Sequence, residues 1–258
     1  MEYLDRYIPR EYLALKINYC RQQLKNLPEV KVQERMVNGS LVKKAIVDKH
    51  RYNIDSKIGN EYFKTAQLRN ELKRELDLLE ALWKYNYKTP VPLLLCKDLD
   101  RTILVGEDLP LNMNKEYFDS LKNDANDKYP KPPFYPFNGT MYRSASEREI
   151  AIFYTELGIP FKYEPEVYIN GLRKPVYPDF VPYFKEINSC KIHEHLGIMS
   201  SSDYIRESKI KFSNYTNAGL IPGIDYIFTY SAEDTVLDPR FLLAGINSLV
   251  FGSMVSSV

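Results

Sequence analysis

The stretch YPDFVPYF at residues 177–184 and the stretch KIHEHLG at residues 191–197 decide the expected fold. Each reads as a strand, and the second follows the first closely enough to lie beside it in a sheet. Asp179 belongs to the first stretch, and Glu194 follows fifteen positions later in the second. We expect the two carboxylates to converge on one point. There they would repel each other and favour a hard divalent cation such as Mg²⁺ between them.

Elements on both sides of these strands predict a layered fold. Ser144 and Ser146 each precede a glutamate by three residues, which is the spacing of a capping box and predicts a helix. Residues 161–169 read as a strand, residues 203–219 as a second helix and residues 224–229 as a last strand. The expected order is αβββαβ. An α+β fold with a mixed central sheet flanked by helices accommodates this order.

Residues 1–88 predict a separate N-terminal extension of the helix–hairpin–helix kind. Apolar residues at spacings of three and four predict two helices, the second capped by Asn60. Between them, alternating residues and the turn signal Asn38-Gly39 predict a β-hairpin or small meander. Lys and Arg outnumber Asp and Glu over residues 31–74, the most basic part of the chain. Both a solvated surface and a phosphate-contacting arm fit this composition.

Residues 89–140 read as a connector, because they are rich in proline and in acidic residues. Leu93–Leu95 and Ile103–Val105 are candidates for short buried strands within it. Residues 141–258 then form the core domain and its C-terminal helix. The longest apolar stretch, residues 241–251, is too short to span a bilayer.

The overall composition excludes several classes of protein. The net charge is +1, so nucleic-acid binding by bulk charge is not expected and would need local patches. Cys20, Cys96 and Cys190 are odd in number and far apart, which argues against a disulfide framework and favours a cytoplasmic protein. Their spacing does not suit a zinc site. The charged N-terminal residues do not resemble an export signal.

These features together resemble the PD-(D/E)XK nuclease superfamily, which has the restriction-endonuclease-like fold. The resemblance covers about residues 142–230, roughly a third of the chain. It is similar to a branch in which the second acid lies in an E-H-x-G motif. The motif string consists of Ser146-Glu147, Tyr163-Glu164, Pro178-Asp179-Phe180, Glu194-His195-Leu196-Gly197 and the helix residues Lys211, Tyr215 and Gly219.

The resemblance implies an Mg²⁺-dependent endonuclease, with Mn²⁺ able to substitute. Asp179 and Glu194 would bind the metal, and the backbone carbonyl of His195 would be a third ligand. Glu147 would reach the same site, although a glutamate at a helix start is also favoured by the helix dipole alone. The side chains of His193 and His195 would point away from Glu194, where packing and hydrogen bonding suit them better than catalysis.

One position departs from the superfamily motif. The usual lysine stands two residues after the second acid, and here that residue is Leu196. Leucine can neither orient a water molecule nor neutralise charge. Some branches supply the lysine from the following helix, and Lys211 is the best match for that role.

Three hypotheses follow for the function. The first is a metal-dependent nuclease acting on DNA, for which a homodimer or a partner protein would supply further affinity, in the style of a compact phage or mobile-element protein. The second is an inactive nuclease-fold protein that binds nucleic acid or inhibits a partner, which Leu196 favours. The third, a small-molecule enzyme, is disfavoured because the chain contains no Gly-rich phosphate loop and no G-x-S-x-G motif.

Overall fold

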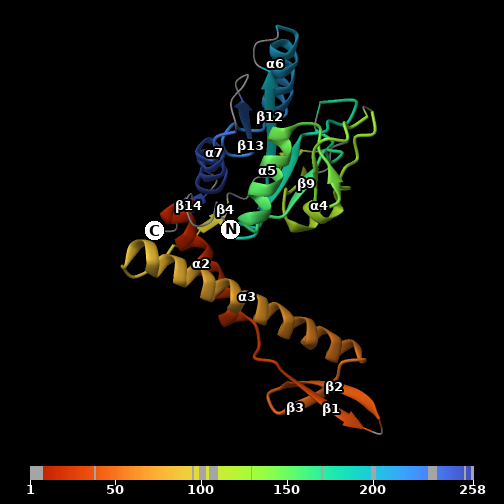
Figure 1. Cartoon of the computed structure of the whole chain (residues 1–258), viewed down its shortest axis with the longest axis vertical. Coiled ribbons are helices and arrows are strands. Elements are labelled where there is room, and N and C mark those ends of the chain that lie inside the picture. The colour runs from red at the N-terminus through yellow and green to blue at the C-terminus, as the bar shows by residue number, and fades with distance from the viewer. Residues whose placement is uncertain are drawn as a thin grey trace. The chain divides into compact units, whose positions relative to one another are not determined.

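The computed structural model describes residues 8–37, 39–94, 96–98, 103–104, 110–128, 130–169, 171–198, 202–231, 237–252 and 254–256. The chain divides into two compact units, one formed by Arg10–Leu95 and the other by Met1–Pro9 together with Cys96–Val258. The secondary structure is a mixture of helices and strands, as expected for an α+β protein (Figure 1). Four residues of the expected turns and short strands lie outside the described residues: Asn38, Leu95, Val105 and Asn170.

The unit Arg10–Leu95 contains two helices and a three-stranded antiparallel meander (Figure 1). Its elements are α2 (Arg10–Asn26), β1 (Lys31–Val37), β2 (Ser40–Val47), β3 (His50–Asn53) and α3 (Lys57–Tyr87). The expected order of helix, hairpin or small meander, and helix is present, and of the two alternatives the structure has the meander.

The helix α3 begins earlier than the sequence predicted. Ser56, and not Asn60, is the N-cap, and its Oγ accepts a hydrogen bond of 3.1 Å from the amide of Gly59. Glycine is a poor helix former, so its presence in the first turn of α3 needs a structural reason. The structure explains why glycine is needed there, because a Cβ would lie 1.8 Å from the carbonyl oxygen of Asn53.

The helices α2 and α3 pack against each other along largely apolar faces. Leu72, Leu79 and Trp83 of α3 are buried, whereas Leu68, which has the same helical spacing, is 44% exposed. The neighbouring residue Arg69 is buried instead, and its Nη1 donates hydrogen bonds of 2.7 and 2.5 Å to two carbonyls at the end of α2. The last carbonyls of a helix lack hydrogen-bond donors within it. Arg69 donates hydrogen bonds at this helix end, which a leucine could not do.

The second unit is built around a mixed five-stranded sheet. Its central elements are α5 (Ala145–Glu156), β9 (Phe161–Tyr163), β10 (Phe180–Phe184), β11 (Ser189–Cys190), β12 (Ile192–Ile198), α6 (Ser202–Asn217) and β13 (Tyr226–Ser231). The predicted αβββαβ order is present, with β11 as an additional short strand. The strand β10 pairs antiparallel with β9, β11 and β12, whereas β13 lies parallel to β12. A parallel neighbour needs a crossover connection, and α6 provides it.

Different helices cover the two faces of β12. The helix α5 lies on the face of His193, whose ring is hydrogen-bonded to the hydroxyl of Tyr154 on that helix. The helix α7 (Pro239–Phe251) packs against β13. Glu194, the next residue along β12, points to the opposite face because side chains alternate along a strand. Its contacts there come from α6.

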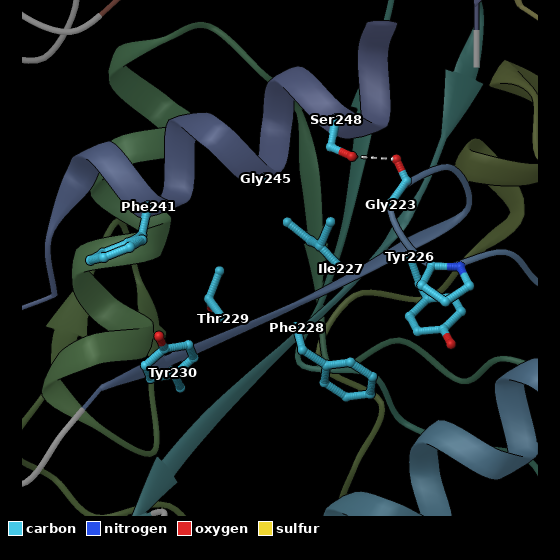
Figure 2. A pocket seen from close by; sticks show the side chains of 10 residues that line it. Gly223, Tyr226, Ile227, Phe228, Thr229, Tyr230, Phe241, Gly245 and Ser248 are labelled. Carbon is cyan, nitrogen blue, oxygen red and sulfur yellow. Dashed lines mark hydrogen bonds between the residues drawn. The ribbon is translucent and has the colours of Figure 1, made fainter. Parts of the chain in front are cut away.

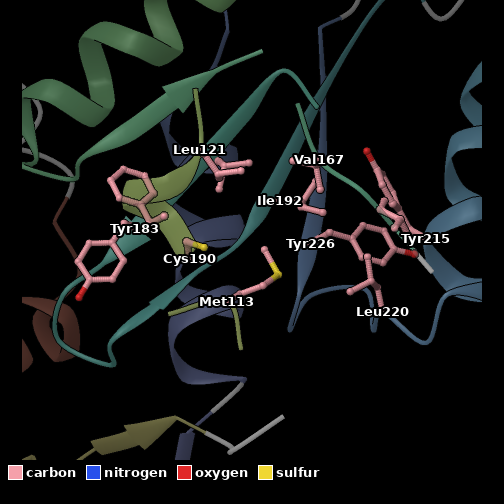
Figure 3. Packing of buried hydrophobic residues seen from close by; sticks show 12 residues of the cluster. Met113, Leu121, Val167, Tyr183, Cys190, Ile192, Tyr215, Leu220 and Tyr226 are labelled. Carbon is pink, nitrogen blue, oxygen red and sulfur yellow. The ribbon is translucent and has the colours of Figure 1, made fainter. Parts of the chain in front are cut away.

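The core on the α6 side of the sheet includes part of the expected connector (Figure 3). Met113, Phe118 and Leu121 are buried in one cluster with side chains of β12, β13 and α6. Phe118 belongs to the short helix α4 (Lys115–Ser120). Residues 89–140 were expected to form a connector of loops and short elements, and the structure differs in this part because three apolar side chains among its polar residues contribute to the core.

The remaining strands form three two-stranded sheets, β5–β6, β7–β8 and β4–β14. They are β4 (Cys96–Asp98), β5 (Ile103–Leu104), β6 (Pro110–Leu111), β7 (Pro136–Phe137), β8 (Thr140–Met141) and β14 (Met254–Ser256). Leu93, expected in a short buried strand, is 74% exposed, so this part of the expectation was wrong. Among the described residues, none of the helices has both the length and the apolar character needed to cross a membrane.

Candidate active site

Asp179 immediately precedes β10 and faces the neighbouring strand β12. Phe180 pairs with His193 in the antiparallel ladder, so the flanking residues Asp179 and Glu194 come to neighbouring positions on the opposite face. The amide of His195 donates a hydrogen bond of 2.7 Å to Oδ2 of Asp179. The two acids that the sequence pointed to therefore meet across one strand pair.

Glu194 is completely buried, and α6 supplies a partner for each of its carboxylate oxygens. Nζ of Lys211 lies 2.7 Å from Oε2, and the hydroxyl of Tyr215 donates a hydrogen bond to Oε1. Lys211 and Tyr215 are four residues apart, so both lie on the same face of the helix. A carboxylate without such partners would be costly to bury.

The electrostatic environment of Asp179 disfavours its charge. Burial and the negative charge of Glu194 raise the pKa of Asp179 well above its ordinary value, although part of its side chain remains accessible. The charge of Lys211 and the amide of His195 act in the opposite direction, but they do not outweigh the first two causes. Within the described part of the chain, Oδ1 of Asp179 accepts no hydrogen bond. This oxygen is available to a cation.

Glu147 lies in the first turn of α5 and belongs to a second group of polar side chains. Ser144 caps this helix, because its Oγ accepts a hydrogen bond from the amide of Glu147. Oε2 of Glu147 accepts hydrogen bonds from the hydroxyl of Tyr163, at 2.6 Å, and from the amide of Arg143, at 3.1 Å. Burial raises the pKa of Glu147, and its charge also contributes to the raised pKa of Asp179. Glu147 therefore lies near enough to influence the paired acids, but its hydrogen bonds are to other residues.

The imidazole rings of His193 and His195 are held by hydrogen bonds on the face opposite Glu194. Oγ1 of Thr229 lies 2.7 Å from Nε2 of His193 and 2.9 Å from Nδ1 of His195. The other nitrogen of His193 contacts the hydroxyl of Tyr154 at 2.8 Å. Burial lowers the pKa of His193 to about 3 and that of His195 to about 4. Both rings are therefore neutral at physiological pH and serve packing and hydrogen bonding, as expected.

An ionic cluster lies beside Glu147, and its lysine, Lys131, was not indicated by the sequence. Glu164 is buried and forms ion pairs with Arg143, at 2.6 Å, and with Lys131, at 3.2 Å. Lys131 also pairs with Asp124. The motif string contained Glu164, but Lys131 lies in a proline-rich stretch with no periodic pattern that could have connected it to this glutamate.

The donors around Asp179 and Glu194 suit a hard cation. Mg²⁺ in proteins is usually held by one or two carboxylates, with the remaining positions filled by water and substrate oxygens. In a strand, the N–H and C=O of one residue point to the same side, so the carbonyl of His195 faces the side from which its amide reaches Asp179. Among the described residues, no three side chains of the Asp, Glu, His or Cys types form a metal-binding group. The fit therefore depends on two carboxylates and a carbonyl.

Comparisons with known proteins identify no relative. The chain matches no model of a known protein family, no curated protein and no solved structure. The assignment of function therefore depends on the geometry of the site.

A cavity of about 310 Å³ lies between β13 and α7 (Figure 2). Its lining is mainly apolar and includes Phe228 and Tyr230 of β13 and Phe241 and Gly245 of α7. None of the paired acids or their α6 partners lines this cavity, so it is separate from the candidate active site.

Proposed function

We propose that this protein is an Mg²⁺-dependent endonuclease that hydrolyses phosphodiester bonds in DNA. The observation that carries the proposal is the convergence of two acids and one lysine from three different elements. Asp179 precedes β10, Glu194 belongs to β12 and Lys211 belongs to α6. The hydrogen bonds among these elements support a site in which metal ligands and a cation act on the same phosphate.

In this proposal, Asp179 and Glu194 hold the metal with the carbonyl of His195, and Mn²⁺ substitutes for Mg²⁺. When bound, the metal would stabilise negative charge on the phosphate and lower the pKa of a water molecule. The raised pKa of Asp179 supports a cation at this point, because a divalent ion would relieve the repulsion between the two carboxylates.

Lys211 takes the role that the strand lysine plays in the superfamily motif. Its ammonium group carries the positive charge that Leu196 lacks and lies on the face of the sheet to which Glu194 points. From there it can orient a water molecule for attack and neutralise charge on the phosphate as the bond breaks. Glu147 would act through its negative charge, either on a water molecule or on Asp179.

The element order supports the finer assignment of a restriction-endonuclease-like core. The helix α5, three antiparallel strands, the crossover helix α6 and the parallel strand β13 follow one another as in the PD-(D/E)XK superfamily. Glu194 lies on β12, and Asp179 lies immediately before β10, the strand that pairs with β12. The same arrangement is compatible with a protein that has kept the fold and lost the reaction.

One observation favours this alternative, an inactive nucleic-acid-binding or inhibitory protein. Lys211 and Tyr215 already occupy both oxygens of Glu194, so a metal would have to share or displace these contacts. If these contacts are too stable to be shared with a metal, Lys211 and Glu194 would form an ion pair that binds no cation. Binding of the metal and cleavage must therefore be measured separately.

The decisive experiment combines calorimetry with a cleavage assay. Mg²⁺ and Mn²⁺ are titrated into the wild-type protein and into Asp179→Ala, and both proteins are then incubated with supercoiled and linear DNA, with and without EDTA. The proposal predicts metal binding and cleavage by the wild type and neither by the variant. Metal binding without cleavage of any DNA would favour the inactive alternative, and absence of both would refute the metal site.

A further inference from the structure

The meander of the first unit has two chemically different faces. Ala45 and Val47 of β2 are buried, and α3 packs against this inner face. Tyr52 of β3 pairs with Ala45 in the ladder, and its ring lies tilted against that of Tyr62 of α3, with 5.0 Å between ring centroids. Side chains alternate along each strand, so the intervening residues of all three strands point away from α3.

The opposite surface, here called the outer face, carries four cations. The register aligns Lys31 with Ile46 and Arg51, Gln33 with Lys44 and Asn53, and Arg35 with Val42. The polar members of the outer face are Lys31, Gln33, Arg35, Ser40, Lys44, Arg51 and Asn53. All seven are exposed. Among the strand residues that the structure describes, no carboxylate points to this face.

The one acid within these strands does not weaken the positive charge of the outer face. Glu34 pairs across the ladder with Lys43, one position removed from Lys44, and therefore belongs to the inner face. Its carboxylate also forms an ion pair of 2.5 Å with Nζ of Lys43. The negative charge is thus balanced on the inner side of the sheet.

The charge of the chain is strongly divided between its parts. Residues 10–95 contain seventeen Lys or Arg and ten Asp or Glu, a formal net charge of +7. The chain as a whole has 35 against 34, so the remaining residues have eighteen against twenty-four and a formal net charge of −6. The neutral total therefore conceals a basic unit, which is the distribution expected of a polyanion-binding module.

We propose that the outer face binds the phosphate backbone of duplex DNA. Cations on an exposed sheet can replace the counterions of DNA, and the major groove is wide enough to admit β-strands. Single strands are bound largely by stacking on aromatic rings, and no aromatic side chain of the described strands lies on this face. Duplex RNA is disfavoured, because its major groove is deep and narrow.

This proposal does not rest on the proposed nuclease function, because it concerns binding by another unit of the chain. Binding of the full-length protein to a fluorescent 25-base-pair duplex is measured by anisotropy in EDTA, over a series of salt concentrations. The double variant Lys44→Gln/Arg51→Gln removes two charges from the outer face. The matched control, Lys73→Gln/Lys84→Gln, removes two charges from exposed positions of α3.

We expect the outer-face variant to bind roughly tenfold or more weakly at about 0.1 M salt, with a salt slope smaller by about two. The control should bind like the wild type. Circular dichroism of both variants checks that the fold is intact, and Arg35→Gln provides an independent substitution on the outer face.

Three results would overturn the proposal. They are equal binding by the outer-face variant and the wild type, preference for single-stranded DNA or duplex RNA, and absence of DNA binding by the wild type. Binding in EDTA by a wild-type protein that also fails to cleave DNA with Mg²⁺ or Mn²⁺ would instead count against the nuclease function and leave the outer face supported.

Discussion

Nζ of Lys211 on α6 lies 2.7 Å from Oε2 of Glu194 on β12, so the lysine reaches this acid from the helix and not from the strand. The residue two positions after Glu194 on the strand is Leu196, which carries no charge. A lysine at position 196 and one at position 211 could thus deliver an ammonium group to the same face of the sheet. The positive charge could therefore occupy the same place in the site whether the strand or the helix provides the lysine.

The first prediction concerns Lys211→Met. If Lys211 acts on the phosphate, cleavage should fall by about 100-fold or more, as for other losses of a transition-state contact. Stability should fall by only about 1 kcal/mol, because the Lys211 side chain is 44% exposed and Tyr215 still donates to Glu194.

The matched control is Lys209→Met, which removes a charge from an exposed position on the same helix. Its cleavage rate should equal that of the wild type. Equal loss in both variants would indicate a general effect of helix charge and would exclude a specific role for Lys211.

The second prediction concerns Asp179→Asn, which should be inactive and yet more stable than the wild type without metal. The substitution removes a charge that burial and Glu194 both disfavour. Mg²⁺ at about 100 times its Kd should stabilise the wild type by about 2.7 kcal/mol and leave the variant unchanged. Thermal denaturation with and without Mg²⁺ measures both effects, and a less stable variant would contradict the repulsion.

The pH dependence of this difference has a defined sign. The pKa of Asp179 is raised in the folded protein, so the folded state holds this proton more strongly than the unfolded state. The stability that the group contributes is present at low pH and is lost as the pH rises above the unfolded value, about 3.9. The Asp179→Asn variant lacks this titrating group, so it should lose little stability as the pH rises above this value. Its free energy of unfolding should therefore exceed that of the wild type by an amount that increases with pH.

The third prediction concerns the hydroxyl of Tyr163. Its hydrogen bond lowers the pKa of Glu147, which burial otherwise raises. Tyr163→Phe should raise this pKa further, so the acidic limb of the pH–rate profile should move to higher pH if Glu147 acts as a carboxylate. Tyr177→Phe is the control, because that hydroxyl contacts Glu166 instead. Identical profiles for both variants would restrict Glu147 to a role in the helix terminus.

The fourth prediction concerns Thr229, whose hydroxyl lies between the two buried histidines. Thr229→Val should cost about 2 kcal/mol of stability, because each ring loses a hydrogen-bonding partner. Denaturant unfolding measures the loss. Thr155→Val removes a hydroxyl that only contacts a carbonyl of its own helix and should cost less. Similar losses in the two variants would show that the Thr229 hydroxyl has no special importance.

The same histidines predict acid sensitivity. Their pKa values are lowered to about 3 and about 4 by burial, so the unfolded chain takes up protons at higher pH than the folded protein. Their contribution to stability is complete above about pH 6.5, the unfolded value, and is lost as the pH falls towards the folded values. This loss of stability at low pH is opposite in sign to the effect of Asp179. Measuring stability against pH in the Asp179→Asn variant therefore separates the contribution of the histidines.

Much of the second unit could be predicted because its signals are local. The three-residue spacing of Ser144 and Glu147 predicted the start of α5, and the structure confirms Ser144 as the cap. The alternation along β12 predicted that Glu194 and the neighbouring histidines would face opposite sides. Lys211 and Tyr215 shared a helical spacing that indicated a common face, although the sequence did not show that both would contact Glu194.

The features that were missed depend on contacts between distant residues. Lys131 reaches Glu164 only after folding, and neither spacing nor composition connects these two residues. Met113 enters the core from a stretch whose average composition is polar and proline-rich. The start of α3 after Ser56 was also missed, and the close contact of Gly59 with Asn53 is visible only in the folded chain.

The position of β1 at the border of its sheet has a consequence for the behaviour of the protein at high concentration. Among the described residues, this strand pairs with β2 on one side only, and every residue of it is exposed, including Met36 at 61%. A free strand border of this kind can recruit the same strand of another molecule. Lys31 and Arg35 counter this by mutual repulsion between copies. Loss of these two charges should therefore lower the solubility of the protein, even in the absence of DNA.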